Sequence, residues 1–307
     1  MYDLVIIGAG PPGLTAGLYA ARSRLDVLLL ERLAPGGQVL TTDWVENYPG
    51  FPEGISGFEL MDKMKSQAEH FDLPIRMEEV VGLEFHPDKK VVITHEGRME
   101  AKALILTSGA TPKKLGIEGE ELLIGKGVSY CATCDGPFYR DQEVAVIGGG
   151  DTALEEALFL TRFASRIHVV HRRDELRGVK LLQDRAMAEK KIEFIWDTVP
   201  LRILGESGVE GIELKNVKTG EIGRKRVQGV FVFIGTQPNA EVINGMVKQD
   251  ENGFVITDEK METSIPGVFA AGDIRSKALR QVSTAVGDGA NAAFSAERYL
   301  ENLVSGT

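Results

Sequence analysis

The sequence is poor in cysteine, in cationic charge and in long hydrophobic runs, and each shortage excludes a class of protein. Only two of the 307 residues are cysteine, so the chain is not a secreted scaffold built from disulfides. Lysine and arginine number 35 against 45 aspartates and glutamates, and the formal charge of −10 argues against a nucleic acid or an anionic membrane as partner. The most apolar opening stretch is broken by glycines and prolines between residues 8 and 13, which is not the pattern of a membrane span.

The chain opens on MYDLVIIGAG, without the basic segment and small-residue cleavage site of a secretory signal. We therefore expect a cytoplasmic protein, in which a Cys-x-x-Cys pair is more often catalytic or metal-binding than structural. A length of 307 residues predicts two domains, and 35 glycines predict many tight turns or close approaches of the backbone to a ligand.

Two segments repeat one pattern of strand, glycine-rich turn, helix and strand. The first, YDLVIIGAGPPGLTAGLYAARSRLDVLLLER, opens the chain, and the second, QEVAVIGGGDTALEEALFLTRFASRIHVVHR, begins at residue 142. Both turns fit the dinucleotide fingerprint, in which one glycine makes the turn, one admits the pyrophosphate and a small residue packs helix on strand. The residues expected to form the two pyrophosphate sites are Gly8, Gly10, Gly13, Gly148, Gly150, Asp151 and Thr152.

A later feature also occurs twice and defines the domains. KALILTSGATP ends at Pro112 and GVFVFIGTQPN has its matching proline at Pro238, and each predicts a buried parallel strand that leaves through a turn. Short alternating strands before each one predict β-meanders. The tail has no glycine fingerprint of its own, so we expect it to complete the first domain. The predicted fold is α/β, with two Rossmann-like, three-layer ββα domains: residues 1–112 and 243–307 form one, and residues 113–242 are inserted into it through two linkers.

The two segments differ where the second strand ends, at the position whose acidic side chain accepts from a ribose 2′-hydroxyl. Glu31 lies 23 residues after Gly8 and suits FAD or NAD. The same distance from Gly148 leads to His171, in a basic corner that favours the 2′-phosphate of NADP(H), because guanidinium groups bind phosphate in bidentate fashion. The arginines of this corner are Arg172, Arg173 and Arg177.

Other residues favour a flavin at the first site. Asp273, in GVFAAGD, follows a predicted strand and is placed to accept from a ribityl hydroxyl. The loop APGGQVLTTDWVENYPG supplies Gly37, Gln38 and Asn47, whose backbone and amide groups suit a polar ring system. Alone, Glu31 does not separate FAD from NAD, and these residues add support for FAD.

Both cysteines fall in SYCATCDGPF, as Cys131 and Cys134, and three interpretations are open. A structural zinc needs about four ligands, whereas the chain offers this pair and five scattered histidines. Free cysteines are also common in protein cores. A redox pair has a mechanism, because a dithiol–disulfide couple suits a flavin that accepts hydride from NADPH. Asp135 is then a candidate acid for the leaving thiolate, or a turn residue before Gly136.

Seven motifs, in order and spacing, carry a resemblance: GAGPPG, GGQ…ENYPG, CATCDG, GGGDTALEEA, HRRDELR, AAGD and RQVSTAVGDG. Over essentially its whole length the chain resembles the bacterial-type (low-molecular-weight) thioredoxin reductases. The resemblance implies a homodimeric enzyme that passes electrons from NADPH through FAD and a disulfide to thioredoxin. It implies that Cys134 is the sulfur nearest the flavin, that Cys131 attacks the thioredoxin disulfide and that Asp135 donates the proton. Asp273, Arg280 and Gln281 fall in the flavin-binding tail of the family.

Two departures from the family pattern are small. Pro12 stands where the family often has alanine, and proline is tolerated in the first turn of a helix. Asp151 stands where an uncharged residue would suit a pyrophosphate better, and we expect it to cap its helix instead.

The predicted architecture raises a geometric problem, because nicotinamide and disulfide belong to the inserted domain and must both reach one flavin in the other. We predict that the inserted domain rotates about its two linkers between two states. Two alternatives stay open: a reductase of another thioredoxin-like or peroxiredoxin-system protein, and a flavin- or NADP(H)-binding redox sensor that does not turn over.

Overall fold

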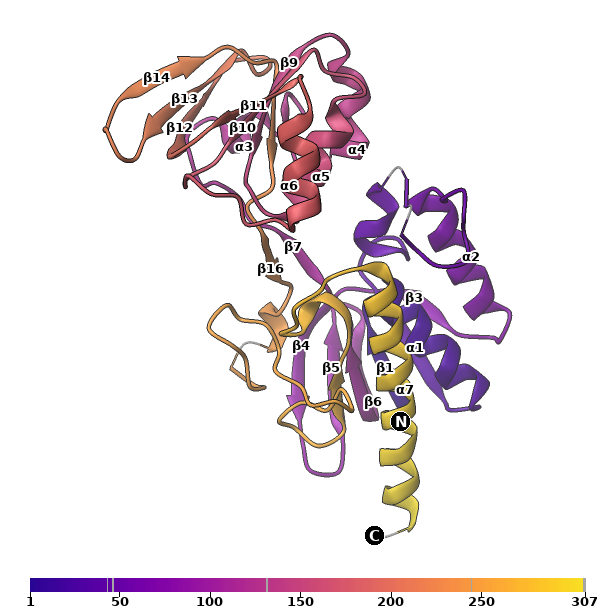
Figure 1. The fold of residues 1–307 in the computed structure, drawn as a ribbon. Helices are drawn as coiled ribbons and strands as arrows, with labels where there is room; N and C mark the ends of the chain where they lie inside the picture. Colours follow the sequence, from indigo (N-terminus) through magenta and orange to yellow (C-terminus); the bar gives the residue numbers. More distant parts are fainter. Residues whose placement is uncertain (43, 46, 131, 244, 306–307) are drawn as a thin grey trace. The chain divides into compact units, whose positions relative to one another are not determined.

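The protein is described from a computed structural model. The described residues are 1–42, 44–45, 47–130, 132–243 and 245–305. The chain divides into two compact units, of which the second, Pro112–Thr236, is inserted into the first, Met1–Thr111 and Gln237–Thr307 (Figure 1). The second crossing lies before the predicted position at residue 242, because Ala240 is buried in the core of the first unit and Val242 packs against that core.

The main sheet of the first unit has the order β3-β2-β1-β6-β5-β4, with β17 paired to β6. Its strands are β1 (Tyr2–Ile7), β2 (Val27–Glu31), β3 (Ile75–Met77), β4 (Val80–Phe85), β5 (Lys90–Thr94), β6 (Gly97–Leu106) and β17 (Val268–Ala270). Its helices are α1 (Pro11–Arg22), α2 (Gly57–Glu69) and α7 (Val282–Ser305), with short 3₁₀ turns η1 (Gly37–Thr41), η3 (Glu241–Ile243) and η4 (Gly272–Ile274). The predicted helix from about residue 281 onward is confirmed as α7.

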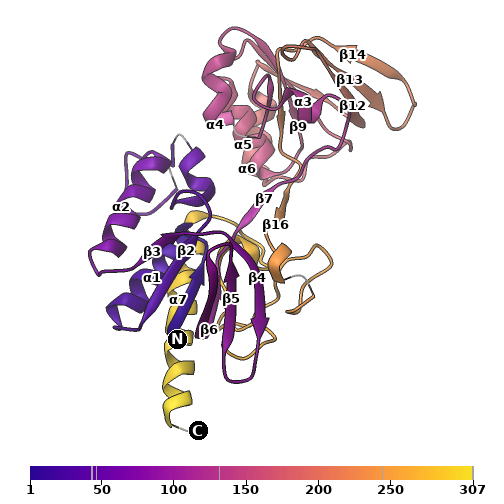
Figure 2. The same cartoon turned by 180° about the vertical axis from the view of Figure 1, so that it is seen from behind.

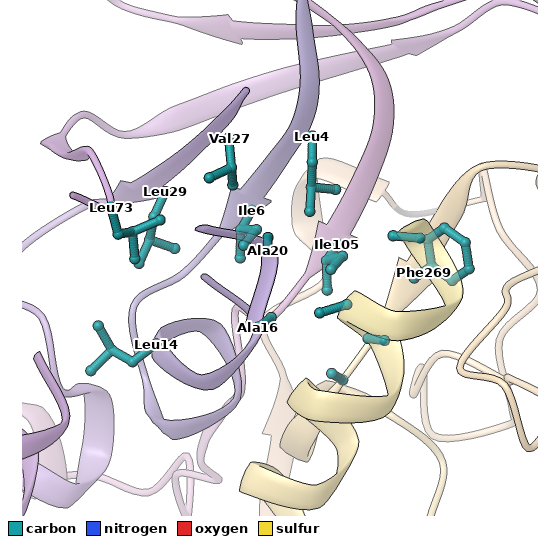
Figure 3. Close-up of a cluster of buried hydrophobic side chains, with 14 of the residues drawn as sticks. Leu4, Ile6, Leu14, Ala16, Ala20, Val27, Leu29, Leu73, Ile105 and Phe269 are labelled. Atoms are coloured by element: carbon teal, nitrogen blue, oxygen red, sulfur yellow. The ribbon is translucent and has the colours of Figure 1, made fainter. Parts of the chain in front are cut away.

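Side-chain alternation along β1 explains why both faces of this sheet are covered. Successive side chains of a strand point to opposite faces. Leu4 and Ile6 pack on the side of α1 and α7, where Phe269 and Ile105 join them (Figure 3). Val5 and Ile7 pack on the other side, in a cluster with side chains of the β4–β5 meander. The first unit is thus a three-layer domain of helices, parallel sheet and meander, seen from behind in Figure 2.

Strand β6 pairs with β1 along one edge and with two different strands, β5 and β17, along the other. Its first half pairs antiparallel with β5, from Gly97 to Ala101. Its second half pairs parallel with β17, where Leu104 is opposite Val268 and Leu106 is opposite Ala270. The C-terminal part of the chain therefore completes a sheet that the N-terminal part begins, as the sequence predicted from the missing fingerprint of the tail.

The second unit repeats the plan. Its five-stranded sheet has the order β11-β10-β9-β15-β8, all parallel, and a three-stranded antiparallel sheet β12-β13-β14 forms the meander. The strands are β8 (Val128–Ser129), β9 (Glu143–Ile147), β10 (Arg166–Val170), β11 (Ile192–Ile195), β12 (Thr198–Leu204), β13 (Gly211–Asn216), β14 (Ile222–Lys225) and β15 (Gly229–Val232). The helices are α3 (Glu120–Leu123), α4 (Ala132–Asp135), the 3₁₀ turn η2 (Gly136–Tyr139), α5 (Asp151–Leu160) and α6 (Lys180–Ala188). The predicted pair of Rossmann-like domains is confirmed.

The segment after Pro112 is structured. Glu120 is 1% exposed, and its carboxylate accepts from the Leu115 and Gly116 N–H groups and from the Tyr130 hydroxyl, each at 2.7 Å. A carboxylate that is satisfied in this way holds its loop firmly, because breaking the set would leave buried donors without partners. Burial first, and then the hydrogen bond to Glu120, raise the pKa of Tyr130. This segment therefore belongs to the second unit.

The two crossings between the units run side by side. They form the short strands β7 (Ala110–Pro112) and β16 (Thr236–Pro238), which pair as a sheet of their own. Lys113 N–H donates to Gly235 O at 2.9 Å, and Asn239 N–H donates to Gly109 O at 3.0 Å. Within the residues that the structure describes, no helix is both long and apolar enough to cross a membrane.

Candidate functional site

The first glycine-rich turn joins β1 to α1 and is shaped by steric limits. Gly8 has φ +106°, and a Cβ there would lie 2.6 Å from the Thr107 carbonyl oxygen. A Cβ on Gly13 would overlap the Gly8 carbonyl, so the helix packs tightly on the strand. At Gly10 the nearest atom is 3.7 Å away, which leaves room for a ligand group. Pro12 occupies the first turn of α1, as expected, where its missing N–H is not needed.

Glu31 ends β2 beside this turn. Its Oε2 accepts from the Ala9 N–H at 2.7 Å and its Oε1 from the Leu33 N–H at 3.0 Å. An ionised carboxylate has about four acceptor positions, so both oxygens keep capacity for a ribose hydroxyl. The structure thus places the carboxylate at the position where a dinucleotide ribose is bound in this fold.

Two further contacts join predicted flavin-site residues that are far apart in the sequence. Gly37 has φ +59°, and its Cβ position lies 3.3 Å from the Gly10 Cα. The Asn47 amide nitrogen donates to the Gln281 side-chain oxygen at 2.9 Å, across 234 residues of sequence. Two residues predicted separately to hold a flavin therefore touch each other, and Gln38 lies on η1 between Gly37 and Asn47.

Asp273 gives the test of whether this site fits a flavin dinucleotide. Its Oδ1 is buried and accepts no hydrogen bond among the described residues: the Lys277 ammonium lies 3.6 Å away, within ion-pair distance only, and 40% of the whole Asp273 side chain is exposed. Burial raises the pKa of Asp273, while the cations Lys277 and Arg280 oppose the rise. A buried acceptor without a partner is costly unless a ligand satisfies it. The ribityl hydroxyl predicted from the sequence would do so, and the residues present fit the group.

Arg280 contacts the backbone of the segment that contains Asp273. Its guanidinium lies over the Phe254 ring at 4.0 Å, Nη2 donates to the Arg275 carbonyl at 3.2 Å, and Nε approaches the Asp273 carbonyl at 3.5 Å. The structure places Arg280 as a support of the Asp273 backbone, in reach of the predicted flavin site.

The second glycine-rich turn joins β9 to α5 with the same geometry. Gly148 has φ +149°, and a Cβ there would lie 2.8 Å from the Ala153 Cβ, which confirms the small residue as a packing requirement. No atom lies within 4 Å of the Cβ position of Gly150. Thr152 is exposed in the first turn of α5, where free N–H groups and the helix dipole favour a phosphate.

Residues 172–179, here called the arginine loop, follow β10 and return to this turn. The Arg177 N–H donates to the Gly149 carbonyl at 2.7 Å. Arg172, Arg173 and Arg177 are exposed, and within the part of the chain that the structure describes none of their guanidinium groups is engaged in an ion pair. Three unpaired cations thus surround the corner where a 2′-phosphate is expected.

His171 and Asp151 take part in shaping that corner. The His171 Nε2 lies 3.0 Å from the Glu175 carbonyl, so this nitrogen carries the proton. Burial lowers the pKa of His171, and the neighbouring arginines lower it further, against the hydrogen bond to Glu175. The expectation that Asp151 caps α5 is wrong: its Oδ1 accepts from the Val179 N–H of the arginine loop at 2.6 Å.

The described part of the Cys-x-x-Cys segment, helix α4, packs against α5. Cys131 is outside the described residues, and of Cys134 only the backbone, in α4, is described. Ala132 is fully buried against α5, and a Cβ on Gly136 would lie 3.2 Å from the Leu160 side chain. Asp135 is partly buried at the end of α4, and its charge adds to burial in raising the pKa of Tyr139. Helix α5 therefore begins at the second glycine-rich turn and packs against the segment that contains the cysteine motif.

Comparison with known proteins identifies the family. The model of the pyridine nucleotide-disulphide oxidoreductases matches residues 2–289. A thioredoxin reductase of Peptoclostridium litorale is 48% identical over 309 residues, which cover 99% of this chain and 98% of the relative. The thioredoxin reductase of Bacillus subtilis is 44% identical and covers 99% of this chain and 96% of its own. The chain belongs to the thioredoxin reductase family.

Solved structures of thioredoxin reductases agree with this assignment. The crystal structure of the Lactococcus lactis enzyme is 48% identical, with a TM-score of 0.93 over 98% of this chain and 100% of that chain. The T. acidophilum structure is 33% identical, with a TM-score of 0.88 over 98% of this chain and 99% of that one. The resemblance seen in the sequence is confirmed, the chain is an oxidoreductase, and membership implies the use of a flavin and a nicotinamide nucleotide.

The sequence did not reveal the ion network around the turn that contains Asp273. Asp288, on α7, binds the Arg275 guanidinium at 2.8 Å and the Lys277 ammonium at 3.0 Å, and its Oδ2 accepts from the Gly272 N–H at 3.0 Å. The side chains are only 11–13% exposed, so the charges depend on one another. A signal was present: Asp288 is the one charge in the otherwise small and apolar stretch AVGDGANAA.

Proposed function

We propose that this chain is an NADPH-dependent thioredoxin reductase, which uses FAD and the Cys131–Cys134 pair to reduce the disulfide of thioredoxin. The observation that carries the proposal is the double role of α5, which begins at the second dinucleotide turn and packs against the cysteine motif. The names of the relatives support thioredoxin as substrate. In this proposal the first unit binds FAD and the second binds NADPH.

The first unit supplies the FAD-binding groups. Gly8, Gly10 and Gly13 admit the pyrophosphate, Glu31 accepts from the adenosine ribose, and Asp273 accepts from the ribityl chain. In this proposal the ring system is held by Gly37, Gln38, Asn47, Arg280 and Gln281, of which Asn47 and Gln281 are hydrogen-bonded to each other. When bound, FAD supplies a two-electron carrier between NADPH and the disulfide.

The second unit supplies the NADPH-binding groups. Gly148, Gly150 and Thr152 hold the pyrophosphate at the start of α5, with Asp151 beside them. Arg172, Arg173 and Arg177 bind the 2′-phosphate through charge-assisted hydrogen bonds. At this corner the neutral side chain of His171 stands where a carboxylate would repel the 2′-phosphate. At the equivalent position of the first site, Glu31 supplies such a carboxylate, which disfavours a 2′-phosphate there.

The cysteine chemistry balances as two thiol–disulfide exchanges. The Cys131 thiolate attacks one sulfur of the thioredoxin disulfide, and the released thiolate takes a proton from Asp135. The Cys134 thiol then gives its proton to Asp135, and the resulting thiolate attacks the Cys131 sulfur. This restores the Cys131–Cys134 disulfide and releases the second thioredoxin thiolate, which takes its proton from water. Thioredoxin gains two electrons and two protons in this exchange, and the electrons that reduce the Cys pair again come from NADPH.

The reaction cycle requires contact at about 3–3.5 Å in two separate steps, hydride transfer and thiol exchange. We propose that the second unit rotates on the paired strands β7 and β16 between the two geometries. A short bifunctional cross-link between the units should block turnover with thioredoxin while leaving one half-reaction intact. Full turnover after quantitative cross-linking, measured by NADPH consumption, would contradict the rotation.

We further propose a cytoplasmic homodimer. A reduced dithiol supplied by NADPH suits a reducing compartment, and a homodimer is what the sequence resemblance implies. Light scattering of the purified holoenzyme gives the mass of the assembly and so tests the dimer.

Replacing Asp273 with alanine should raise the dissociation constant of FAD about tenfold to a hundredfold, because charge-assisted hydrogen bonds to the ribityl chain are lost. The ratio of flavin to protein absorbance after purification, and fluorescence titration of the apoprotein, measure the change. Asp62→Ala, on the exposed face of α2, removes a carboxylate from the same unit and should keep full flavin occupancy. Equal occupancy in the two variants would exclude Asp273 from flavin binding.

The function is tested with purified wild-type protein. We expect a yellow flavin spectrum and sustained NADPH oxidation that depends on added thioredoxin. A single reduction of the flavin without turnover would favour a redox sensor. Turnover with another thioredoxin-like or peroxiredoxin-system protein, but not with thioredoxin, would identify a different acceptor.

A further inference from the structure

The arginine loop is tied to the beginning of α5 at several points. The Arg177 and Gly178 N–H groups both donate to the Gly149 carbonyl, at 2.7 and 3.2 Å. Leu176 is buried beside Leu154 of α5. The cations of the loop are therefore not on a free surface segment, and their distance from the glycine-rich turn is fixed by local contacts.

One of these ties is a side chain. Asp151 is the first residue of α5, and its Oδ1 accepts from the Val179 N–H at 2.6 Å. The bond joins the residue that follows the glycine-rich turn to the residue that ends the arginine loop, 28 positions along the chain. It thus connects the turn that would hold the pyrophosphate directly to the loop that would hold the 2′-phosphate.

The fit around this bond is close. A Cβ on Gly178 would lie 2.8 Å from the Leu154 Cδ1 and 3.1 Å from the Asp151 Oδ1, so the loop backbone lies against the helix start. On the far side of the loop, His171 bonds the Glu175 carbonyl. The arginines between these two ties have little freedom to change their distance from α5.

The chemistry of Asp151 needs an explanation, because a carboxylate beside a pyrophosphate repels it. A hydrogen bond to a charged acceptor is stronger than one between neutral groups. An aspartate at position 151 therefore binds the Val179 N–H more strongly than an uncharged side chain would.

We propose that Asp151 is a positioning residue for the 2′-phosphate: it holds the arginine loop at the distance from the second dinucleotide turn that distinguishes NADPH from NADH. The inference rests on the proposed use of NADPH. It goes beyond that proposal, because it assigns nucleotide specificity to a residue that bears the same charge as the phosphate.

The proposal separates two properties of Asp151, its charge and its acceptor oxygen. Asp151→Ala removes both, whereas Asp151→Asn keeps an acceptor for the Val179 N–H. Val179→Pro removes the donor and leaves Asp151 unchanged; the φ of −61° at Val179 already suits proline. Asp174→Ala is the matched control, because it removes a carboxylate from the same loop whose partner is the surface residue Lys218.

The experiment compares two adenosine ligands on each purified holoenzyme variant by titration calorimetry. We expect Asp151→Ala and Val179→Pro to raise the dissociation constant of 2′,5′-ADP about tenfold, which is the effect of a misplaced charge-assisted hydrogen bond. The dissociation constant of ADP should change by less than about twofold. Asp151→Asn should restore most of the preference, and Asp174→Ala should bind as the wild type does. The KM for NADPH should rise in the same two variants, with kcat at saturation and the KM for NADH little changed.

The outcomes distinguish the inference from the function on which it rests. A wild type without preference for 2′,5′-ADP over ADP overturns both. A wild type with the preference, retained in Asp151→Ala and Val179→Pro, overturns the inference alone. Equal weakening of both ligands also overturns it, since that result shows a general role in folding or pyrophosphate binding. If Asp151→Ala does not fold, Val179→Pro alone decides.

Discussion

Cys134→Ser should abolish NADPH-dependent reduction of thioredoxin, lowering the rate by at least about a thousandfold, while the protein stays yellow. Serine forms no disulfide, so neither the internal pair nor its regeneration is possible, and loss of a covalent catalytic group has effects of this size or larger. In the proposed function the FAD-binding residues all belong to the first unit, so we expect the variant to keep its flavin. The rate of NADPH consumption with thioredoxin measures the effect.

Two controls make this result specific. Thr133→Ser changes one of the two residues between the cysteines and should keep activity, because the dithiol remains. Reduction of a small artificial acceptor such as a quinone should continue in Cys134→Ser, since it needs NADPH and flavin only. Normal thioredoxin reduction by Cys134→Ser would overturn the disulfide route.

The double replacement of Arg172 and Arg173 by alanine should raise the KM for NADPH about a hundredfold and change the KM for NADH by less than about threefold. Each guanidinium provides a charge-assisted hydrogen bond to the 2′-phosphate that NADH lacks. Both side chains are exposed and unpaired among the described residues, so their loss leaves no buried partner behind. Steady-state kinetics with each nucleotide measure the two constants.

Arg185→Ala is the matched control, because it removes an exposed arginine of α6 in the same unit. It should leave both KM values near those of the wild type. The NADPH preference of the wild type should also weaken with added salt, because exposed charges are screened. A double variant that loses both nucleotides equally would contradict the assignment of these arginines to the 2′-phosphate.

Much of the fold follows from local patterns. The four consecutive apolar residues from Leu4 to Ile7 predict that β1 belongs to a sheet buried on both faces. Both dinucleotide turns depend on glycines, such as Gly8 and Gly148, whose neighbours leave no room for a Cβ. Such features depend on a few adjacent residues, so the sequence predicts them well. The inserted arrangement was predicted by the same logic, from a tail without a fingerprint.

The supporting contacts were harder to predict because they depend on tertiary structure. Asp288 meets Arg275 and Lys277 only when α7 packs next to the 3₁₀ turn η4. Asp151 suggested a helix cap by its position, but the arginine loop offered it a free N–H from another segment. The predicted boundary at residue 242 lies a few residues late, because the turn after Pro238 has no strong signal in the sequence, whereas the packing of Ala240 and Val242 in the first unit depends on tertiary structure.

The pairing of β6 with both β5 and β17 also sets an order of events during synthesis. Strand β17 and helix α7 reach the ribosome exit long after β6, because the whole inserted unit is translated between Leu106 and Val268. At roughly 5–20 residues per second, this gap lasts on the order of ten seconds. The inserted unit is continuous and has all of its strands by then, so it can fold first. Until β17 and α7 are synthesised, the apolar face formed by Leu4, Ile6 and Ile105 is only partly covered. A nascent chain stalled before β17 should therefore present that face to chaperones.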